Sequence, residues 1–186
     1  MKKSLLLGAA VFSALTFLGV NVKAEGNNMG SKVLIAFYSY SGNTKEVAEA
    51  IQKETGGDLF EIKAEGTYPA EYRPMTVQAK KEIEEGFRPA LTTSVDNIAD
   101  YDVVFIGSPN WWGTITPQVS SFLEKYDLSG KKVVPVITHG GGGVQNTVKD
   151  LTAQCKGCEV VDDAWVGYNS RTMGVSRWVK GLGLNK

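Results

Sequence analysis

Five short apolar runs recur along the chain, and each of them predicts a β-strand. They cover residues 32–38, 59–62, 101–107, 131–138 and 158–166. The runs are apolar almost throughout instead of alternating with polar residues, a pattern typical of strands buried on both faces of a parallel sheet. Pro135 lacks an N–H group and fits such a strand only at a bulge or near an edge. Asp162-Asp163 interrupts the last run.

Segments with helical periodicity separate the apolar runs. Helices are predicted over residues 43–55, 75–85, 117–126, 144–154 and 175–182. Thr116 and Pro117 suit the N-cap and the first position of the third helix. Strands that alternate with helices in this way predict one doubly wound α/β domain over residues 32–186, with right-handed crossovers. In such a domain, ligands bind beyond the carboxyl ends of the strands.

The first 24 residues have the pattern of a secretory signal peptide. A basic start precedes an apolar stretch over residues 5–20, and Val22-Lys23-Ala24 offers small residues at the two positions read by a signal peptidase. We therefore predict that residues 1–24 are removed and that residues 25–31 form a short extension. The mature protein would then be exported, periplasmic or secreted, without stable membrane insertion. The alternative is that the apolar stretch stays in place as an N-terminal membrane anchor.

Composition and charge exclude several classes of function. The chain has 20 basic and 20 acidic residues, and three of the lysines lie in residues 1–24, so the predicted mature protein has a net charge of −3. No basic patch therefore favours nucleic acid as a partner. One histidine and two cysteines argue against a zinc site, which needs several such ligands. A hydrophobic content of 42% is typical of a globular chain and excludes a disordered one.

The two cysteines, Cys155 and Cys158, form a C-x-x-C pair. In an oxidising compartment such a pair is expected to close as a disulfide. A redox-active pair normally lies at the N-terminus of a helix, where the helix dipole favours the thiolate. This pair instead follows a predicted helix and precedes a predicted strand. We therefore favour a local structural cross-link over a redox-active pair.

The loop after the first predicted strand is rich in hydroxyl groups and opens directly into a helix. Its sequence is Ser39-Tyr40-Ser41-Gly42-Asn43-Thr44. Backbone N–H groups at the start of a helix are suited to binding an anion. The loop has no lysine or arginine, and it matches neither the P-loop nor the dinucleotide fingerprint. It indicates a terminal monophosphate held by neutral donors, or, more simply, a capped helix start.

Two further loops follow the third and fourth predicted strands and should meet the first loop at one edge of the sheet. Gly107-Ser108-Pro109-Asn110-Trp111-Trp112-Gly113 has two adjacent tryptophans, one of which can stack on a flat aromatic ligand while the other covers the core. Thr138-His139-Gly140-Gly141-Gly142-Gly143 either lets the backbone approach a ligand closely or forms a flexible turn. His139, beside this loop, is a candidate for a direct contact with such a ligand.

The first loop resembles the phosphate loop of flavodoxins, whose pattern is Ser/Thr-x-Ser/Thr-Gly-x-Thr, and the other two loops fall where a flavodoxin has them. The resemblance covers residues 31–184 and implies a three-layer sandwich around a five-stranded parallel sheet of order 2-1-3-4-5. It also implies noncovalently bound FMN. The implied cofactor-binding residues are Ser39, Tyr40, Ser41, Gly42, Asn43, Thr44, Pro109, Asn110, Trp111, Trp112, Gly113, His139, Gly140, Gly141, Gly142 and Gly143.

The resemblance also implies a role for each of these loops. The first loop would hold the phosphate, Trp111 or Trp112 would flank the isoalloxazine ring, and His139 with the glycines would contact its pyrimidine edge. The Trp112–Gly113 peptide would reorient to accept a hydrogen bond from N5–H of the one-electron-reduced flavin.

The function implied first is electron transfer between redox partner proteins, which the sequence does not identify. The alternatives are an NAD(P)H:quinone oxidoreductase of the same fold and a protein that stores or delivers flavin.

Overall fold

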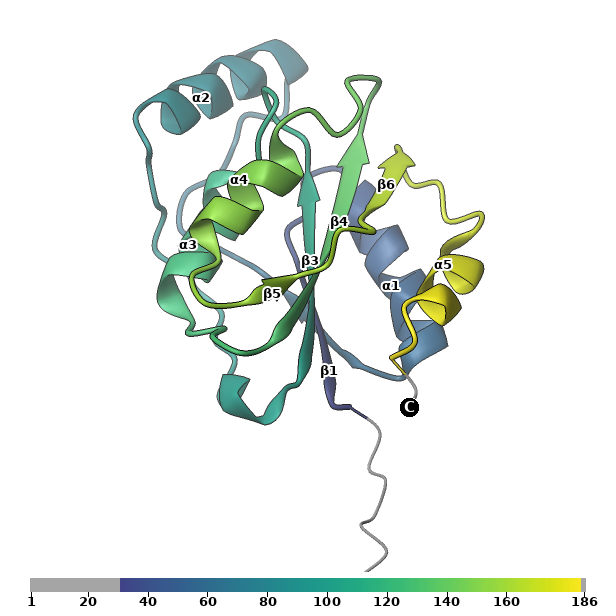
Figure 1. Cartoon of the computed structure of the whole chain (residues 1–186). Coiled ribbons are helices and arrows are strands. Elements are labelled where there is room, and N and C mark those ends of the chain that lie inside the picture. Colours follow the sequence, from purple (N-terminus) through teal and green to yellow (C-terminus); the bar gives the residue numbers. More distant parts are fainter. Residues whose placement is uncertain (1–30, 185–186) are drawn as a thin grey trace, which may run out of the picture.

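The computed structural model describes residues 31–184, which form a parallel sheet with helices on both faces (Figure 1). The strands are β1 (Val33–Phe37), β2 (Asp58–Glu61), β3 (Val103–Pro109), β4 (Lys132–His139), β5 (Glu159–Val160) and β6 (Trp165–Tyr168). Their order is β2-β1-β3-β4-β5, and β6 pairs with β4 as well. The predicted fold and strand order are therefore confirmed. The predicted signal peptide lies outside the described residues.

The last predicted strand is wrong in one respect, because it is two short strands instead of one. β5 pairs with the start of β4, and β6 pairs with its end. Between them, Asp162 and Asp163 are exposed, and the N–H of Ala164 donates to the carbonyl of Asp162 (3.0 Å). The two carboxylates stay in water, since a charged group is costly to bury without a partner. Pro135 lies in the stretch of β4 that faces this break, which agrees with its missing N–H.

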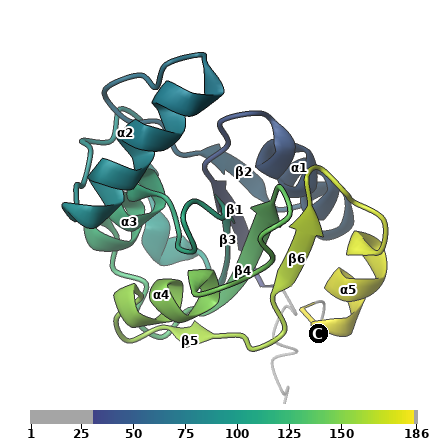
Figure 2. The same ribbon diagram turned by 90° about the horizontal axis from the view of Figure 1, so that it is seen from above.

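The helices lie in two layers, one on each face of the sheet. Within residues 31–184 they are α1 (Asn43–Thr55), α2 (Tyr72–Glu84), α3 (Pro117–Lys125), α4 (Thr147–Gln154), α5 (Val175–Gly181) and the short 3-10 helix η1 (Ile98–Asp100). Seen from above, α1 and α5 cover one face and α3 and α4 cover the other (Figure 2). α4 begins three residues later than predicted, because Gln145 has a left-handed φ of 45° that an α-helix does not accommodate. α2 begins three residues earlier, because Pro74 falls in its first turn, where no hydrogen bond is lost.

Successive residues of the strands point to opposite faces, so the sheet has a hydrophobic core on each side. On one side, Ile35 of β1 packs with Ile51 of α1 and Val179 of α5. On the other side, Leu34 of the same strand packs in a cluster with Phe122 of α3. The two cores hold the central strands in place, and the loops at their carboxyl ends therefore start from fixed positions.

Cys155 and Cys158 are joined by a disulfide between α4 and β5. Cys155 caps the end of α4, where its N–H donates to the carbonyl of Leu151 (2.9 Å). The pair therefore lies at the C-terminal end of a helix, away from the helix N-termini where thiols are activated.

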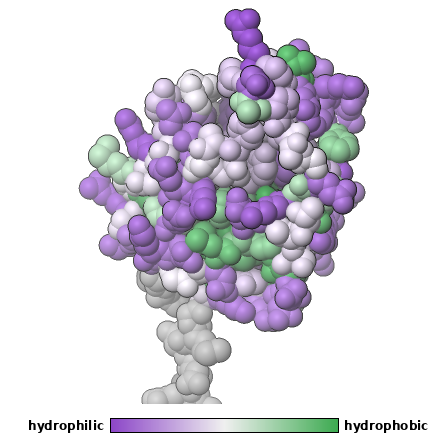
Figure 3. All heavy atoms as spheres, turned by 180° about the vertical axis from the view of Figure 1, so that it is seen from behind, coloured by the Kyte–Doolittle hydropathy of each residue, from purple (hydrophilic) through white to green (hydrophobic). Residues whose placement is uncertain are grey.

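The surface of the domain is mainly hydrophilic. In the view from behind, a smaller hydrophobic area shows in the lower half of that face (Figure 3). None of the helices in residues 31–184 combines the length and the apolar character that crossing a membrane requires.

Candidate cofactor site

The three predicted loops meet at the carboxyl edge of the sheet and line a pocket of about 1040 Å³. The first loop contributes Tyr40, Ser41, Asn43 and Thr44, the second Pro109, Asn110, Trp111, Trp112 and Gly113, and the third His139, Gly140 and Gly142. The remaining predicted residues, Ser39, Gly42, Gly141 and Gly143, belong to these loops but do not line the pocket. The spacing of the loops in the sequence thus predicts most of the lining.

Sequence analysis missed the wall that α2 contributes. This helix lies beyond the carboxyl ends of the strands, on the side of the sheet that α3 covers (Figures 1 and 2), and Tyr72, Met75, Thr76 and Ala79 line the pocket from it. Met75 and Ala79 are its buried residues. Helical periodicity shows that one face of residues 75–85 is apolar, but it does not show what that face covers. The other lining residues missed are Thr138, Gln145, Asn146 and Asn169.

The first loop presents a row of free backbone N–H groups. Among the described residues, none accepts a hydrogen bond from the N–H groups of residues 40–44. Gly42, the N-cap of α1, has a φ of 89°, which glycine adopts at little cost. The N–H row thus runs through this turn into the first residues of α1. Ser39 also has a role within the loop, because its Oγ accepts from the N–H of Lys45 (3.2 Å). The N–H row and the N-terminal end of the helix dipole together favour a bound anion.

The start of α1 lies unusually close to the sheet. Thr44 and Thr138 are buried and share a hydrogen bond between their hydroxyl groups (2.9 Å), which connects α1 to the end of β4. Gly107 of β3 allows this approach, because a Cβ there would lie 2.6 Å from Cβ of Phe37 and 3.1 Å from Cγ2 of Thr44. A glycine in β3 therefore sets the height of the N–H row above the sheet.

The two tryptophans of the second loop have different surroundings. Trp111 makes edge-to-face contacts with Tyr38, Tyr40 and Tyr68, at 5.0–5.9 Å between ring centres. Trp112 is 57% exposed, and its Nε1–H donates to the carbonyl of Thr76 in α2 (2.9 Å). Trp111 is thus a wall held in place by other rings, whereas Trp112 connects the loop to α2.

Behind Trp111 lies a hydrogen-bonded network that keeps the tyrosines protonated. The hydroxyl of Tyr68 donates to Glu82 of α2 and accepts from Nε2 of Gln118 (3.0 Å). Burial, and then the hydrogen bond to Glu82, raises the pKa of Tyr68 well above its ordinary value. Burial also raises the pKa of Tyr38, helped by Tyr40 and Glu82 nearby. Both phenols are neutral at neutral pH, as ordinary tyrosines are, and the raised pKa values extend this neutral state to more alkaline pH.

In the third loop, His139 is held by the glycines that follow it. Its Nδ1 accepts a hydrogen bond from the N–H of Gly141 (3.0 Å), which leaves Nε2 as the ring nitrogen available to a ligand. Gly141 and Gly143 have φ values of 132° and 72°, which other residues rarely adopt. His139 and the backbone of Gly140 and Gly142 line this side of the pocket.

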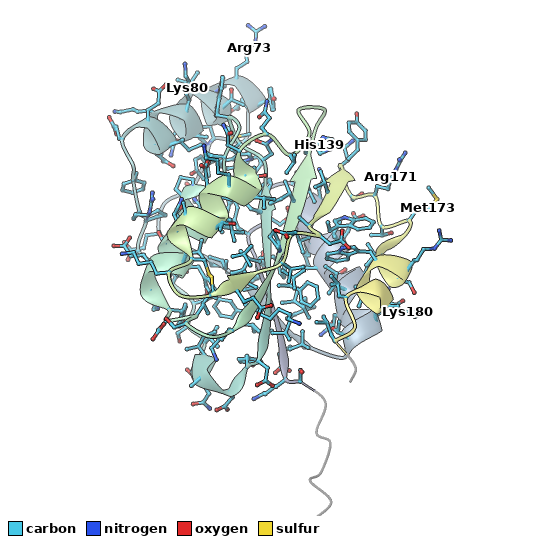
Figure 4. All side chains as sticks on the ribbon, viewed as in Figure 1. Arg73, Lys80, His139, Arg171, Met173 and Lys180 are labelled. Carbon is cyan, nitrogen blue, oxygen red and sulfur yellow. A yellow bond between two sulfur atoms is a disulfide. The ribbon has the colours of Figure 1, made fainter. Side chains whose placement is uncertain are left out.

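No charged side chain of residues 31–184 lines the pocket. Arg73 and Lys80 on α2 and Arg171 beyond β6 lie outside the lining (Figure 4). Lys80 lies beside the pocket wall without lining it, with its Nζ 5.3 Å from the centre of the Trp112 ring and 3.6 Å from Oε1 of Glu84. An anion in this pocket is therefore met by neutral donors.

These features fit FMN. The unpartnered N–H row suits a monophosphate, the aromatic walls suit a flat ring system, and the amide and imidazole groups around the third loop suit the polar edge of such a ring. FMN supplies one- and two-electron redox chemistry when it is bound. The fold and the site together define the class of α/β flavoproteins, and the N–H row makes the first loop the candidate position of the phosphate.

Comparison with known proteins identifies the family. Residues 32–182 match the family described as Flavodoxin, and the chain belongs to this family. The match covers nearly all of the described residues, and it confirms FMN as the predicted cofactor.

Solved structures and curated relatives agree with this assignment. A flavoprotein in complex with FMN from Lactobacillus acidophilus is 27% identical, with a TM-score of 0.64 over 80% of this chain and 98% of that one. A protein from Bacteroides eggerthii is 29% identical, with a TM-score of 0.70 over 82% and 98%. An NAD(P)H dehydrogenase (quinone) of Archaeoglobus fulgidus is 29% identical over 109 residues, which are 54% of this chain and 52% of that protein. The chain spans about half the length of this curated relative.

Proposed function

We propose that the protein is an FMN-dependent electron-transfer protein, which passes electrons between redox partner proteins through the flavin. The observation that carries the proposal is the row of free N–H groups at residues 40–44, which opens into an uncharged pocket with aromatic walls. Trp112 and Tyr72 support a protein partner, because both line the pocket and are 57% and 75% exposed. A partner that covers them would bury apolar surface next to the flavin.

The residues of the pocket would bind and orient the cofactor. The N–H row would hold the phosphate, and Trp111, fixed by three tyrosines, would offer a rigid face to the ring. Nε2 of His139 would be the ring nitrogen available to the cofactor from the third loop. If residues 1–24 act as a signal, as we propose, the partners lie outside the cytoplasm.

The test is a spectrum of the purified protein, followed by anaerobic titration with dithionite. A flavin spectrum from bound FMN, with a long-wavelength band of one-electron-reduced flavin midway through the titration, is the result expected for a carrier. Protein that stays colourless after FMN is added would refute the proposal.

The phosphate site has a separate test. Thr44→Ala removes the hydroxyl bond to Thr138 that positions the start of α1, so it should weaken FMN binding roughly tenfold. Riboflavin has no phosphate for the N–H row to hold and should lose less. Thr152→Ala, at an exposed threonine of α4, is the matched control. Equal losses of the two flavins would argue against a phosphate site at this loop.

A second candidate function is the reduction of quinones by NAD(P)H. The residues with which α2 lines the pocket favour it. This helix turns the edge of the sheet into a pocket of about 1040 Å³, which is at the upper end of the range for small-molecule sites. Such a pocket has room for a flat acceptor beside the flavin, and the name of the Archaeoglobus relative agrees with this chemistry. Steady-state turnover of NAD(P)H with a quinone, without the long-wavelength band, would favour this candidate over the carrier.

A further inference from the structure

Asn110 joins the two loops that follow β3 and β4. Its Oδ1 accepts from the N–H of Gly113 (2.9 Å). Its Nδ2 donates to the carbonyl of Gly143 (2.7 Å) and to Oε1 of Gln145 (3.2 Å). Both hydrogens of the side-chain amide thus have acceptors within the protein. The resemblance predicts Asn110 as a cofactor contact; Asn110 lines the pocket, and its side chain also joins two parts of the pocket wall.

The segment that Asn110 holds is a tight turn with an unusual backbone. Two hydrogen bonds of 3.1 Å between Trp111 and Thr114 close it. Trp112 and Gly113, its central residues, have φ values of 53° and 90°, which define a type I′ turn. The orientation of the peptide between them depends on Trp112, which has a side chain, staying in the left-handed region. The bond from Gly113 N–H to Oδ1 of Asn110 holds this peptide in its observed orientation.

Gln145 supports the same arrangement from the other loop. It has a left-handed φ of 45°, which is uncommon for a residue with a side chain. A Cβ on Gly113 would lie 3.1 Å from Oε1 of Gln145, so the glutamine packs directly against the turn. The N–H of Asn146 donates to the carbonyl of Gly113 (2.9 Å). The turn is therefore held by Asn110 at the N–H of Gly113 and by Asn146 at its carbonyl.

We propose that Asn110 is a positioning residue, which fixes the orientation of the Trp112–Gly113 peptide relative to the glycine loop. This geometry sets the part of the pocket wall that faces the ring of the cofactor. The proposal rests on the proposed function in so far as that ring belongs to FMN. Because Asn110 does not touch the phosphate loop, its loss should affect FMN and riboflavin by similar factors.

Amide hydrogen exchange of the flavin-free full chain tests the contact itself. Asn110→Ala should speed exchange at Gly113 roughly three- to tenfold, the effect of one hydrogen bond. Asn110→Asp keeps the Oδ1 acceptor and should preserve protection at Gly113, while it loses the donor to Gly143. Asn97→Ala, at an exposed asparagine beside η1, is the control and should change neither. Unchanged exchange at Gly113 in Asn110→Ala, or equal rates in the Ala and Asp variants, would overturn the proposal.

The flavin-loaded protein tests the consequence. Asn110→Ala should weaken FMN and riboflavin equally, roughly three- to tenfold, and shift the one-electron reduction potential of the flavin by up to about 59 mV, the equivalent of a tenfold change. If Asn110→Ala binds both flavins as tightly as wild type and has the wild-type one-electron potential, the proposed positioning role of Asn110 is overturned. If the wild-type protein binds no flavin, the proposed function fails, and exchange at Gly113 still decides the role of Asn110.

Discussion

Gly107→Ala should damage the phosphate site from inside the sheet. Gly107 lies in β3, next to β1, with α1 above it. An added Cβ would lie 2.6 Å from Cβ of Phe37, a distance that real Cβ atoms essentially never show. It would also lie 3.1 Å from Cγ2 of Thr44. Phe37 is buried in the same cluster as Val47 and Ala48 of α1, so relief of the clash should displace the start of α1 as well.

The size of the effect follows from the clash. Forcing one extra methyl group into a packed core costs about 1–3 kcal/mol. For a domain of this size that corresponds to a fall in Tm of roughly 2–12 °C. The same shift moves Thr44 and the N–H row, so FMN should bind roughly tenfold less tightly, whereas riboflavin should lose less.

Two measurements check this prediction, thermal unfolding and titration with FMN and riboflavin. Gly181→Ala is the matched control, because a Cβ at this exposed position in α5 meets nothing within 4 Å. It should be neutral or slightly stabilising, since alanine favours a helix more than glycine does. A Gly107→Ala protein with the Tm and FMN affinity of wild type would refute the idea that this glycine sets the height of α1.

Three further outcomes are expected. Trp112→Phe keeps an aromatic ring but removes the Nε1–H donor to α2, so hydrogen exchange in α2 should speed up a few-fold, and exchange at wild-type rates would contradict this. Burial, and then the bond to Asp58, raises the pKa of Tyr101 from 10.0 to about 12. The protonated Tyr101 hydroxyl therefore contributes its full stabilisation below pH 10, and this contribution is lost as the pH rises toward 12. The free energy of unfolding, measured with urea, should therefore fall less between pH 9 and pH 11.5 in Tyr101→Phe than in wild type. Equal decreases would rule this out. Replacing Cys155 and Cys158 with serine should cost about 2 kcal/mol of unfolding free energy, the value for so short a loop, and leave FMN affinity unchanged.

The sheet and its loops could be predicted because their signals are local. Strands buried on both faces are apolar along their whole length, as residues 33–37 and 103–106 are, and the glycine-rich or hydroxyl-rich loops follow directly. The order of strands came from the family resemblance, since no single run of residues encodes it.

The missed parts of the site depend on contacts between distant segments. The place of α2 over the pocket is decided by few contacts, such as Trp112 with Thr76, which are 36 residues apart. The role of Asn110 depends on Gly143 and Gln145, more than 30 residues away. The late start of α4 depends on Gln145 packing against Gly113, and periodicity contains no sign of that contact.

The row of free N–H groups has a consequence for the conditions under which the protein works. Attraction between full charges weakens as ionic strength rises, because mobile ions screen it over about 10 Å at 0.1 M salt. Donors in direct contact with a phosphate act within a few ångströms and leave little space for such ions. A pocket without lysine or arginine should therefore keep its cofactor about equally well in dilute and in salty surroundings. For a protein predicted to leave the cell, that independence of the medium would preserve function where the cell no longer controls the salt.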